Sequence, residues 1–176
     1  MKNFLFPDRY IKSVYTHNFE EEYKSGKRGL IFDIDNTLVP HDHKATKEYI
    51  ELIKKLKDLG FKIVIVSNNN EERVRDFTSE TNIPYVYMAH KPSKKGYLKA
   101  CEMMNLERDR VLFFGDQIYT DILGANRAGI ESVLVEPLDR STDIKKIKLK
   151  RYLEKPVINC FFKRKGLQLW AFSYKI

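Results

Sequence analysis

Hydrophobic and polar positions follow two patterns along residues 30–135, and each pattern predicts one kind of element. Short runs that are almost wholly apolar predict buried strands, whereas apolar residues spaced three and four apart predict amphipathic helices. The apolar runs are residues 30–32, 61–66, 83–88, 111–114 and 132–135. Between them lie helical patterns, of which residues 45–59 are the clearest, since they end in front of Gly60.

Strands and helices therefore alternate with short connections, which is typical of a parallel sheet covered by helices on both faces. We predict an α/β, Rossmann-like fold with one domain over residues 29–140. Residues 1–28 are expected to form a helical lead-in, because Tyr10, Ile11, Val14 and Tyr15 make one stripe at helical spacing. Asn18 is a candidate cap for a second short helix.

Polar side chains sit at or just beyond the ends of the first four predicted strands. They are Asp33, Asp35, Ser67, Lys91, Asp116 and Asp121. An Asp-x-Asp pair alone fits an ordinary turn or a helix cap, but parallel sheets bind ligands at the carboxyl ends of their strands. The shared position of these residues therefore favours a single functional site.

The chemistry of this set suits phosphoryl transfer. A carboxylate can attack a phosphoryl group and carry it as an aspartyl phosphate, a role that we assign to Asp33. Asp35 is then the acid/base, while Ser67, Asn68 and Lys91 hold the phosphate oxygens.

Close carboxylates also need a cation between them, and hard Mg²⁺ prefers oxygen ligands. Asp116 is expected to complete the ligands of this ion, with Asp121 either binding the ion or supporting a ligand. His41, Asp42 and His43 follow the first strand, but we do not expect them to bind a metal.

Composition narrows the class of protein. The chain has 176 residues, is 43% hydrophobic and contains two cysteines without a C-x-x-C pair, which indicates one globular domain in a reducing, cytoplasmic setting. We find no signal peptide and no apolar run long enough for a membrane span.

The net charge of +8 is concentrated at the C-terminal end. Residues 140–176 carry 11 lysines and arginines against two acidic residues. We expect a basic amphipathic helix over residues 142–155 that Pro156 ends, followed by an apolar segment and Trp170. Three interpretations stay open for residues 141–176: a solvated basic helix with a segment packed on the core, docking on an anionic membrane surface, and, less favoured, binding of nucleic acid.

The ordered motifs Asp33-Ile-Asp35-Asn-Thr-Leu, Ser67-Asn68, Lys91-Pro92 and Gly115-Asp116-x₄-Asp121 resemble those of the haloacid dehalogenase (HAD) superfamily. The resemblance covers about residues 30–129. It implies a Rossmann-like fold, an aspartyl-phosphate intermediate and Mg²⁺ held by Asp33, Asp116 and the backbone carbonyl of Asp35. An aspartate at the position of Asp35 goes with phosphatases in this family.

Two intervals between motifs are too short for a cap domain. Each of residues 36–66 and 67–91 holds little more than one helix and one strand, so the chain resembles the capless subclass III. An open site suggests a substrate whose bulk stays outside. The motif DNTLVPHD and the lead-in FPDRYIKSVY are also similar to YqeG-like phosphatases, a group related to phosphatidylglycerophosphate phosphatases.

The leading hypothesis is therefore a Mg²⁺-dependent phosphomonoester hydrolase that acts near a membrane, with phosphatidylglycerophosphate as a candidate substrate. A phosphatase of polynucleotide ends or of small metabolites would use the same residues. A non-catalytic, phosphate-sensing module is the alternative from another class, because receiver domains also combine aspartates, a hydroxyl and a lysine. Such a module would not need Asp35 as acid/base.

Overall fold

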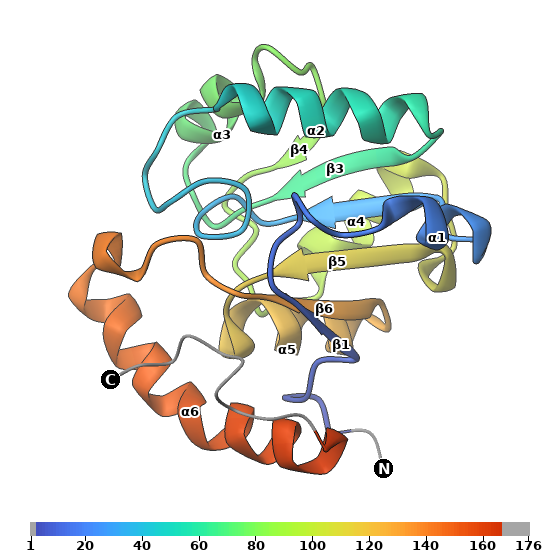
Figure 1. Ribbon diagram of the computed structural model, residues 1–176. Coiled ribbons are helices and arrows are strands. Elements are labelled where there is room, and N and C mark those ends of the chain that lie inside the picture. Colours follow the sequence, from blue (N-terminus) through green and yellow to red (C-terminus); the bar gives the residue numbers. More distant parts are fainter. Residues whose placement is uncertain (1–2, 167–176) are drawn as a thin grey trace.

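The architecture is a parallel sheet between two helical layers, seen in a computed structural model that describes residues 3–166 (Figure 1). The strands are β1 (Arg9–Ile11), β2 (Gly29–Phe32), β3 (Lys62–Val66), β4 (Tyr85–Val86), β5 (Val111–Gly115) and β6 (Glu131–Val135). Among the described residues they form one sheet in the order β1-β6-β5-β2-β3-β4, with every pairing parallel. The predicted Rossmann-like α/β fold is confirmed.

Six α-helices accompany the strands within residues 3–166. They are α1 (Phe19–Lys24), α2 (Lys47–Asp58), α3 (Glu71–Thr78), α4 (Lys95–Met104), α5 (Leu123–Ala128) and α6 (Lys145–Lys165). The side chain of Thr46 caps α2 by accepting from the Tyr49 N–H, and Gly60 follows that helix with a positive φ of 93°. Asn18 caps α1 as predicted.

Alternating side chains of the central strands fill two separate cores. Leu30 and Phe32 of β2 pack on one face with α1, α2 and α3, whereas Ile31 points to the other face with α4 and α5. Because β2 is buried on both faces, its sequence is continuously apolar. The predicted polar residues follow the carboxyl ends of these buried strands.

The N-terminal segment departs from the prediction. Residues 9–11 form the edge strand β1, which pairs with Val133–Val135 of β6, and only residues 19–24 of the lead-in are an α-helix. Adjacent apolar residues at positions 10 and 11 suit a strand, since Tyr10 packs on the side of α6 and Ile11 on the opposite core. Pairing of the open sheet edge therefore outweighs the helical spacing of these residues.

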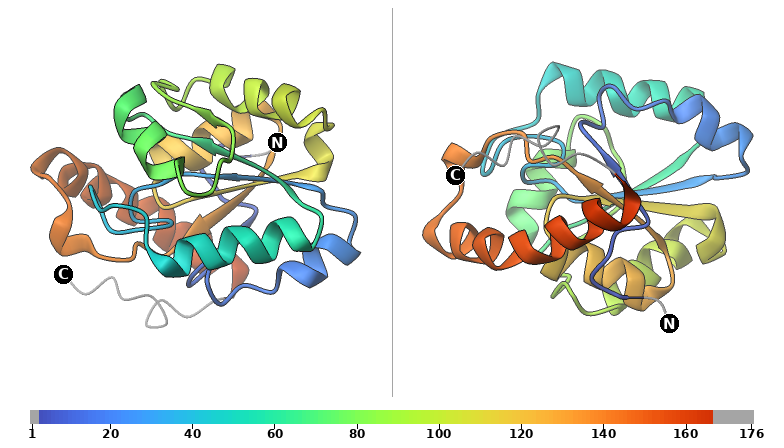
Figure 2. Two further views of the ribbon diagram at one scale, coloured as in Figure 1. Left: turned by 90° about the horizontal axis from the view of Figure 1, so that it is seen from above. Right: turned by 60° about the horizontal axis from the view of Figure 1, so that its bottom comes forward.

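The C-terminal segment also differs from the prediction. α6 continues through Pro156 to Lys165, although proline removes one intrahelical hydrogen bond. Ile158, Phe161 and Phe162 hold the second half of the helix against Leu134 of β6. This burial offsets the loss at the proline, and α6 lies along the β1–β6 end of the sheet (Figure 2). Residues 167–176, with Trp170, lie outside the described part of the chain.

The start of α4 is a smaller departure. Lys94, and not the predicted Ser93, occupies the cap position, and no side chain caps that helix end. The Ser93 hydroxyl accepts from the Lys95 N–H at 3.4 Å, a long hydrogen bond.

Candidate active site

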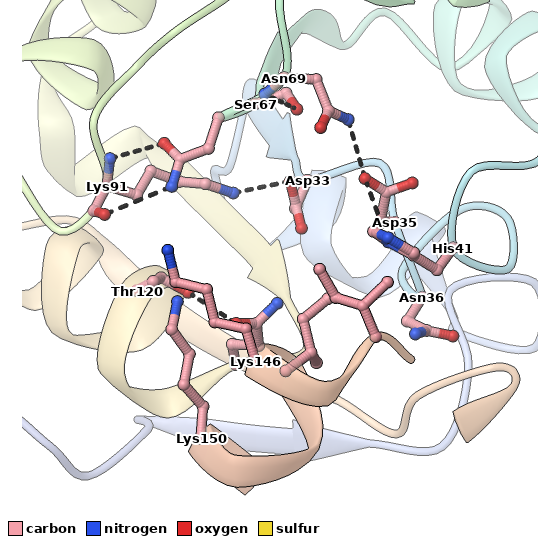
Figure 3. A pocket seen from close by; sticks show the side chains of 14 residues that line it. Asp33, Asp35, Asn36, His41, Ser67, Asn69, Lys91, Thr120, Lys146 and Lys150 are labelled. Carbon is pink, nitrogen blue, oxygen red and sulfur yellow. Dashed lines mark hydrogen bonds and ion pairs between the residues drawn. The ribbon is translucent and has the colours of Figure 1, made fainter. Parts of the chain in front are cut away.

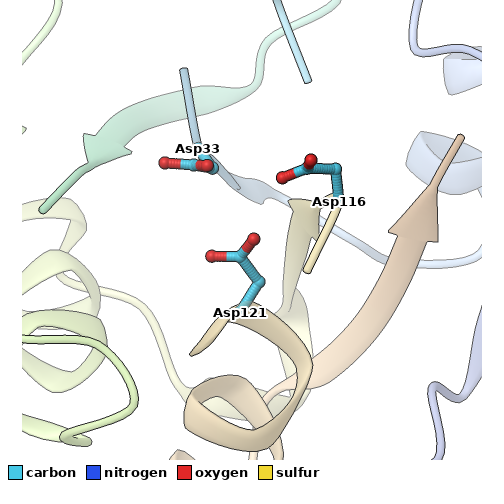
Figure 4. A group of neighbouring side chains, drawn as sticks. All are labelled: Asp33, Asp116 and Asp121. Carbon is cyan, nitrogen blue, oxygen red and sulfur yellow. The ribbon is translucent and has the colours of Figure 1, made fainter. Parts of the chain in front are cut away.

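Three buried carboxylates meet at the carboxyl edge of the sheet. Asp33 follows β2, Asp116 follows β5, and Asp121 lies on the π-helical turn Ile118–Ile122 that precedes α5 (Figure 4). Their exposed fractions are 6%, 1% and 0%, and one carboxylate oxygen from each lies within 4.8 Å of the others. Parallel register brings them together, because the Asp33 N–H continues the ladder by donating to the Phe114 carbonyl at 2.9 Å.

The acidic triad fits a divalent cation. Asp116 Oδ1 is buried and has no hydrogen-bond partner among the described residues. Burial raises the pKa of Asp33 well above its ordinary value and that of Asp116 to about 6, because charged carboxylates are poorly solvated there. A hard cation bound by these oxygens would favour the charged forms. The triad therefore has the ligands that a metal site requires.

Gly115 permits the close approach of Asp121 to β5. A Cβ atom at position 115 would lie 2.6 Å from Asp121 Cβ, far inside van der Waals contact. The Gln117 N–H also donates to Asp121 Oδ2 at 3.0 Å, so the carboxylate is fixed on one side by backbone. Glycine at position 115 therefore leaves the space that Asp121 needs to join the triad.

Lys91 places its positive charge against two carboxylates of the triad. Its Nζ lies 2.6 Å from Asp33 Oδ1 and 2.7 Å from Asp121 Oδ1. Burial lowers the pKa of Lys91, but the two carboxylates outweigh this effect and hold the pKa above its ordinary value. Lys91 is therefore charged and placed beside the proposed nucleophile.

Asn68 fixes Lys91 through the backbone. Its Oδ1 accepts from the Lys91 N–H at 2.7 Å, and its Nδ2 donates to the Lys91 carbonyl at 3.3 Å. The side chain of Asn68 is thus occupied, which leaves its backbone N–H as the group for the predicted phosphate contact. Ser67 is 1% exposed, and its Oγ accepts from the Asn69 N–H at 3.2 Å, so the hydroxyl hydrogen can still be donated.

Asp35 lies apart from the triad and faces the pocket (Figure 3). Its carboxylate accepts from the Asp42 N–H at 3.0 Å and from Asn69 Nδ2 at 2.8 Å. Arg73 and His41 approach within 3.6 and 3.7 Å. His41 thus contacts Asp35 and does not belong to the acidic triad. Because Asp33 and Asp35 are two residues apart, both face the pocket, while Ile34 between them is buried in the core.

Helix α6 supplies a part of the site that the sequence did not reveal. Arg151 is 5% exposed and donates from Nη2 to Asp116 Oδ2 at 2.5 Å, and its Nε contacts Asp143. Asp143 also accepts from Asn36 Nδ2 at 2.8 Å. The C-terminal helix is therefore joined to a predicted metal ligand through buried ion pairs.

Glu154 is a second buried group from α6. It accepts from the Tyr119 N–H at 3.1 Å, and burial raises the pKa of Glu154 to about 8. Arg151, Glu154, Ile158 and Phe162 fall three and four residues apart on one side of the helix. That spacing is the signal in the sequence, because charged residues on an apolar face are buried with it.

The pocket itself has a volume of about 320 Å³ and lies between the strand ends and α6. Asp33, Asp35, Ser67, Asn68 and Lys91 line one wall. The other wall is formed by Ile144 and by Lys146, Ile147 and Lys150 of α6. Figure 3 shows the two lysines. The structure thus brings five predicted residues to one pocket and closes it with a helix from outside the predicted domain.

These features match a known family. A family model described as haloacid dehalogenase-like hydrolase matches residues 41–129. The chain belongs to the haloacid dehalogenase-like hydrolases. Between the motifs of residues 33–91 the structure places loops and the elements α2, β3, α3 and β4 alone, which fits the expected lack of a cap domain.

Two curated relatives are similar over most of the chain. Probable phosphatase YqeG of Bacillus subtilis is 37% identical over 171 residues, which cover 97% of this chain and 98% of the relative. Phosphatidylglycerophosphate phosphatase 1, chloroplastic/mitochondrial, of Arabidopsis thaliana is 26% identical over 179 residues, 95% of this chain and 51% of that protein. Family and relatives together confirm the predicted enzyme class, a HAD-type phosphatase.

Solved structures share the fold. An uncharacterized protein from Listeria monocytogenes serotype 4b superposes with a TM-score of 0.53 at 21% identity, covering 67% of this chain and 82% of that one. Within residues 3–166, no helix is both long and apolar enough to cross a membrane.

Proposed function

We propose that this phosphatase is a Mg²⁺-dependent phosphomonoester hydrolase in which Asp33 is the nucleophile and Asp35 the acid/base. The observation that carries the proposal is that the two aspartates have different surroundings. Asp33 belongs to the buried triad beside Lys91, whereas Asp35 stands outside the triad and faces the pocket. A carboxylate nucleophile needs nearby positive charge, which Lys91 gives to Asp33. A general acid/base such as Asp35 needs access to the leaving group.

In the first step, one Asp33 oxygen forms a bond to phosphorus while the bond from phosphorus to the ester oxygen breaks. Asp35 gives its proton to the departing oxygen, which leaves as an alcohol. Lys91 and the Ser67 hydroxyl hold the non-transferring oxygens. In the second step, Asp35 removes a proton from water as the water oxygen attacks phosphorus, so that inorganic phosphate leaves and the Asp33 carboxylate is restored.

The carboxylates of Asp33 and Asp116 and the backbone carbonyl of Asp35 would hold Mg²⁺, which would supply charge neutralisation for the phosphoryl group. Asp121 would bind the ion or hold its surroundings, since this carboxylate also contacts Lys91 and the Gln117 N–H.

The substrate that we propose is a phosphomonoester on a lipid head group, with phosphatidylglycerophosphate as the leading candidate. The name of the Arabidopsis relative supports this choice. We also propose that residues 142–176 contact an anionic membrane surface. The support is that Ile144 and the α6 residues Leu149, Tyr152 and Leu153 are each 53% or more exposed among lysines. Apolar side chains interleaved with basic ones suit an anionic lipid surface.

The test compares the purified protein with an Asp33→Asn variant in Mg²⁺ or EDTA. Phosphate release is measured from an aryl phosphate and from vesicles containing phosphatidylglycerophosphate. The wild type should release phosphate from both, only with Mg²⁺, and the variant should lose at least about a thousandfold in kcat. Equal release by both proteins would contradict the mechanism, and activity on soluble phosphates alone would contradict the lipid substrate.

A further inference from the structure

Two lysines of α6 point into the pocket from the wall that faces Asp33, Ser67 and Lys91. Lys146 and Lys150 both line the pocket, and their side chains extend toward the space beside Lys91 and Thr120 (Figure 3). Four residues separate them on the helix, so the two side chains lie on one face about one turn apart. Lys150 is half-buried and Lys146 is exposed at the rim.

No residue among 3–166 neutralises the charges of these two lysines. Lys91 contacts two carboxylates, and so does Arg151. In contrast, neither Lys146 nor Lys150 forms an ion pair or a side-chain hydrogen bond with any residue of the described chain. Two unpaired ammonium groups in one pocket create a local positive potential that attracts an anion.

The backbone of α6 adds to this potential. The helix has 21 residues, no acidic residue in its first turn and no side chain that caps its N-terminus. Lys146 and Ile147 of this first turn line the pocket, as does the N-cap residue Ile144, so the positive end of the helix dipole lies at the pocket rim.

The transferred phosphate already has its own partners across the pocket. Lys91 and Ser67 lie at the strand ends with Asp33, as does the acidic triad that fits a cation. A single phosphoryl group at Asp33 is therefore provided with positive charge without the helix. The lysines of α6 remain for another anionic group on the same substrate.

We propose that Lys146 and Lys150 form a second anion subsite, which binds a further phosphate group that the substrate carries a few bonds from the hydrolysed phosphomonoester. The inference rests on the proposed phosphatase function and adds a substrate class to it. A phosphodiester in a lipid head group and a second phosphomonoester in a soluble bisphosphate share this chemistry. The enzyme then selects molecules with two phosphate groups over simple phosphomonoesters.

The experiment uses soluble substrates, so that membrane binding plays no part. Glycerophosphoglycerol phosphate has a monoester and a diester, propanediol bisphosphate has two monoesters, and glycerol 3-phosphate has one monoester only. The variant is Lys146→Gln/Lys150→Gln. The matched control is Lys95→Gln/Lys99→Gln, since these α4 lysines have the same spacing, are exposed and do not line the pocket.

The selectivity, defined as kcat/KM for a doubly phosphorylated substrate divided by that for glycerol 3-phosphate, should fall about tenfold or more in the α6 variant. The control should keep the selectivity of the wild type. Loss on the diester alone assigns a lipid-like diester to the subsite, and loss on the bisphosphate alone assigns a soluble bisphosphate. An unchanged selectivity, or an equal loss on all three substrates, would overturn the proposal.

A binding measurement separates this inference from the proposed function. Calorimetry with glycerophosphoglycerol phosphate or propanediol bisphosphate compares Asp33→Asn with the same variant carrying both α6 substitutions. The affinity for at least one of these ligands should fall about tenfold or more. If the wild type hydrolyses none of the substrates, the proposed function fails, while this difference still decides whether the subsite exists. Equal affinities of the two proteins for both ligands would overturn the subsite alone.

Discussion

Replacing Arg151 with methionine tests whether α6 is bound to the site by buried charge. The substitution keeps an unbranched side chain of similar length but removes the guanidinium that contacts Asp116 and Asp143. These carboxylates are 1% and 4% exposed, so the loss leaves buried negative charge without its cation. The arrangement therefore predicts a large effect of one substitution.

Breaking a buried ion pair from one side costs about 3–5 kcal/mol of unfolding free energy. At about 2–4 °C per kcal/mol for a chain of this size, the unfolding midpoint should fall by about 6–20 °C. Thermal and urea unfolding in EDTA measure both quantities. The control is Arg75→Met, which breaks an exposed pair with Asp76 and should cost at most about 1 kcal/mol.

Two further measurements test whether the loss of stability comes from Asp116 and Asp143. Adding Asp143→Asn to Arg151→Met should restore part of the lost stability, because one uncompensated charge disappears. Mg²⁺ should raise the midpoint of Arg151→Met more than that of the wild type, since Asp116 is a proposed ligand freed from its partner. An Arg151→Met protein within about 1 kcal/mol of the wild type would refute the reasoning.

Three other predictions concern single residues. Asn68→Ala should lower kcat about tenfold or more and cost about 1–3 kcal/mol in urea unfolding, because both backbone groups of Lys91 lose their partner. Gly115→Ala should raise the Mg²⁺ concentration for half-maximal activity at least about tenfold by displacing Asp121, and unchanged Mg²⁺ dependence would contradict the triad. Glu154 binds a proton in the folded state between its ordinary pKa of 4.5 and its folded pKa of about 8. Its contribution to stability therefore falls as pH rises through that window, by about 1.4 kcal/mol per pH unit. Urea unfolding in EDTA from pH 5 to 8 should show a weaker decline for Glu154→Gln, and identical slopes would refute this assignment.

The central sheet and the strand-end residues were predictable because local patterns determine them. Four residues of β2 are apolar without interruption, and Asp33 follows directly. Parallel pairing then places Asp33 beside the end of β5, where Asp116 follows. The two aspartates therefore share one site although 83 positions separate them in the sequence.

Residues 9–11 and α6 were predicted less well because distant partners decide their structure. Three residues contain too little pattern to distinguish a strand from a helical stripe, and the partner of β1 is β6, more than 120 positions away. In the sequence, Arg151 is one of many basic residues in a basic segment. Its special role becomes visible only in the fold, which places Asp116, 35 positions earlier, beside it. Long-range burial of charge outweighed the local expectation of a solvated helix.

Covalent capture of the phosphoryl group tests the central claim, that Asp33 is the nucleophile, most directly. The enzyme is mixed with a radiolabelled aryl phosphate and Mg²⁺, quenched in acid during turnover, digested and mapped by mass spectrometry. The mechanism predicts phosphate on Asp33 alone, and an Asp33→Asn variant that stays unlabelled. Label on another residue, or wild-type phosphate release by Asp33→Asn, would contradict it.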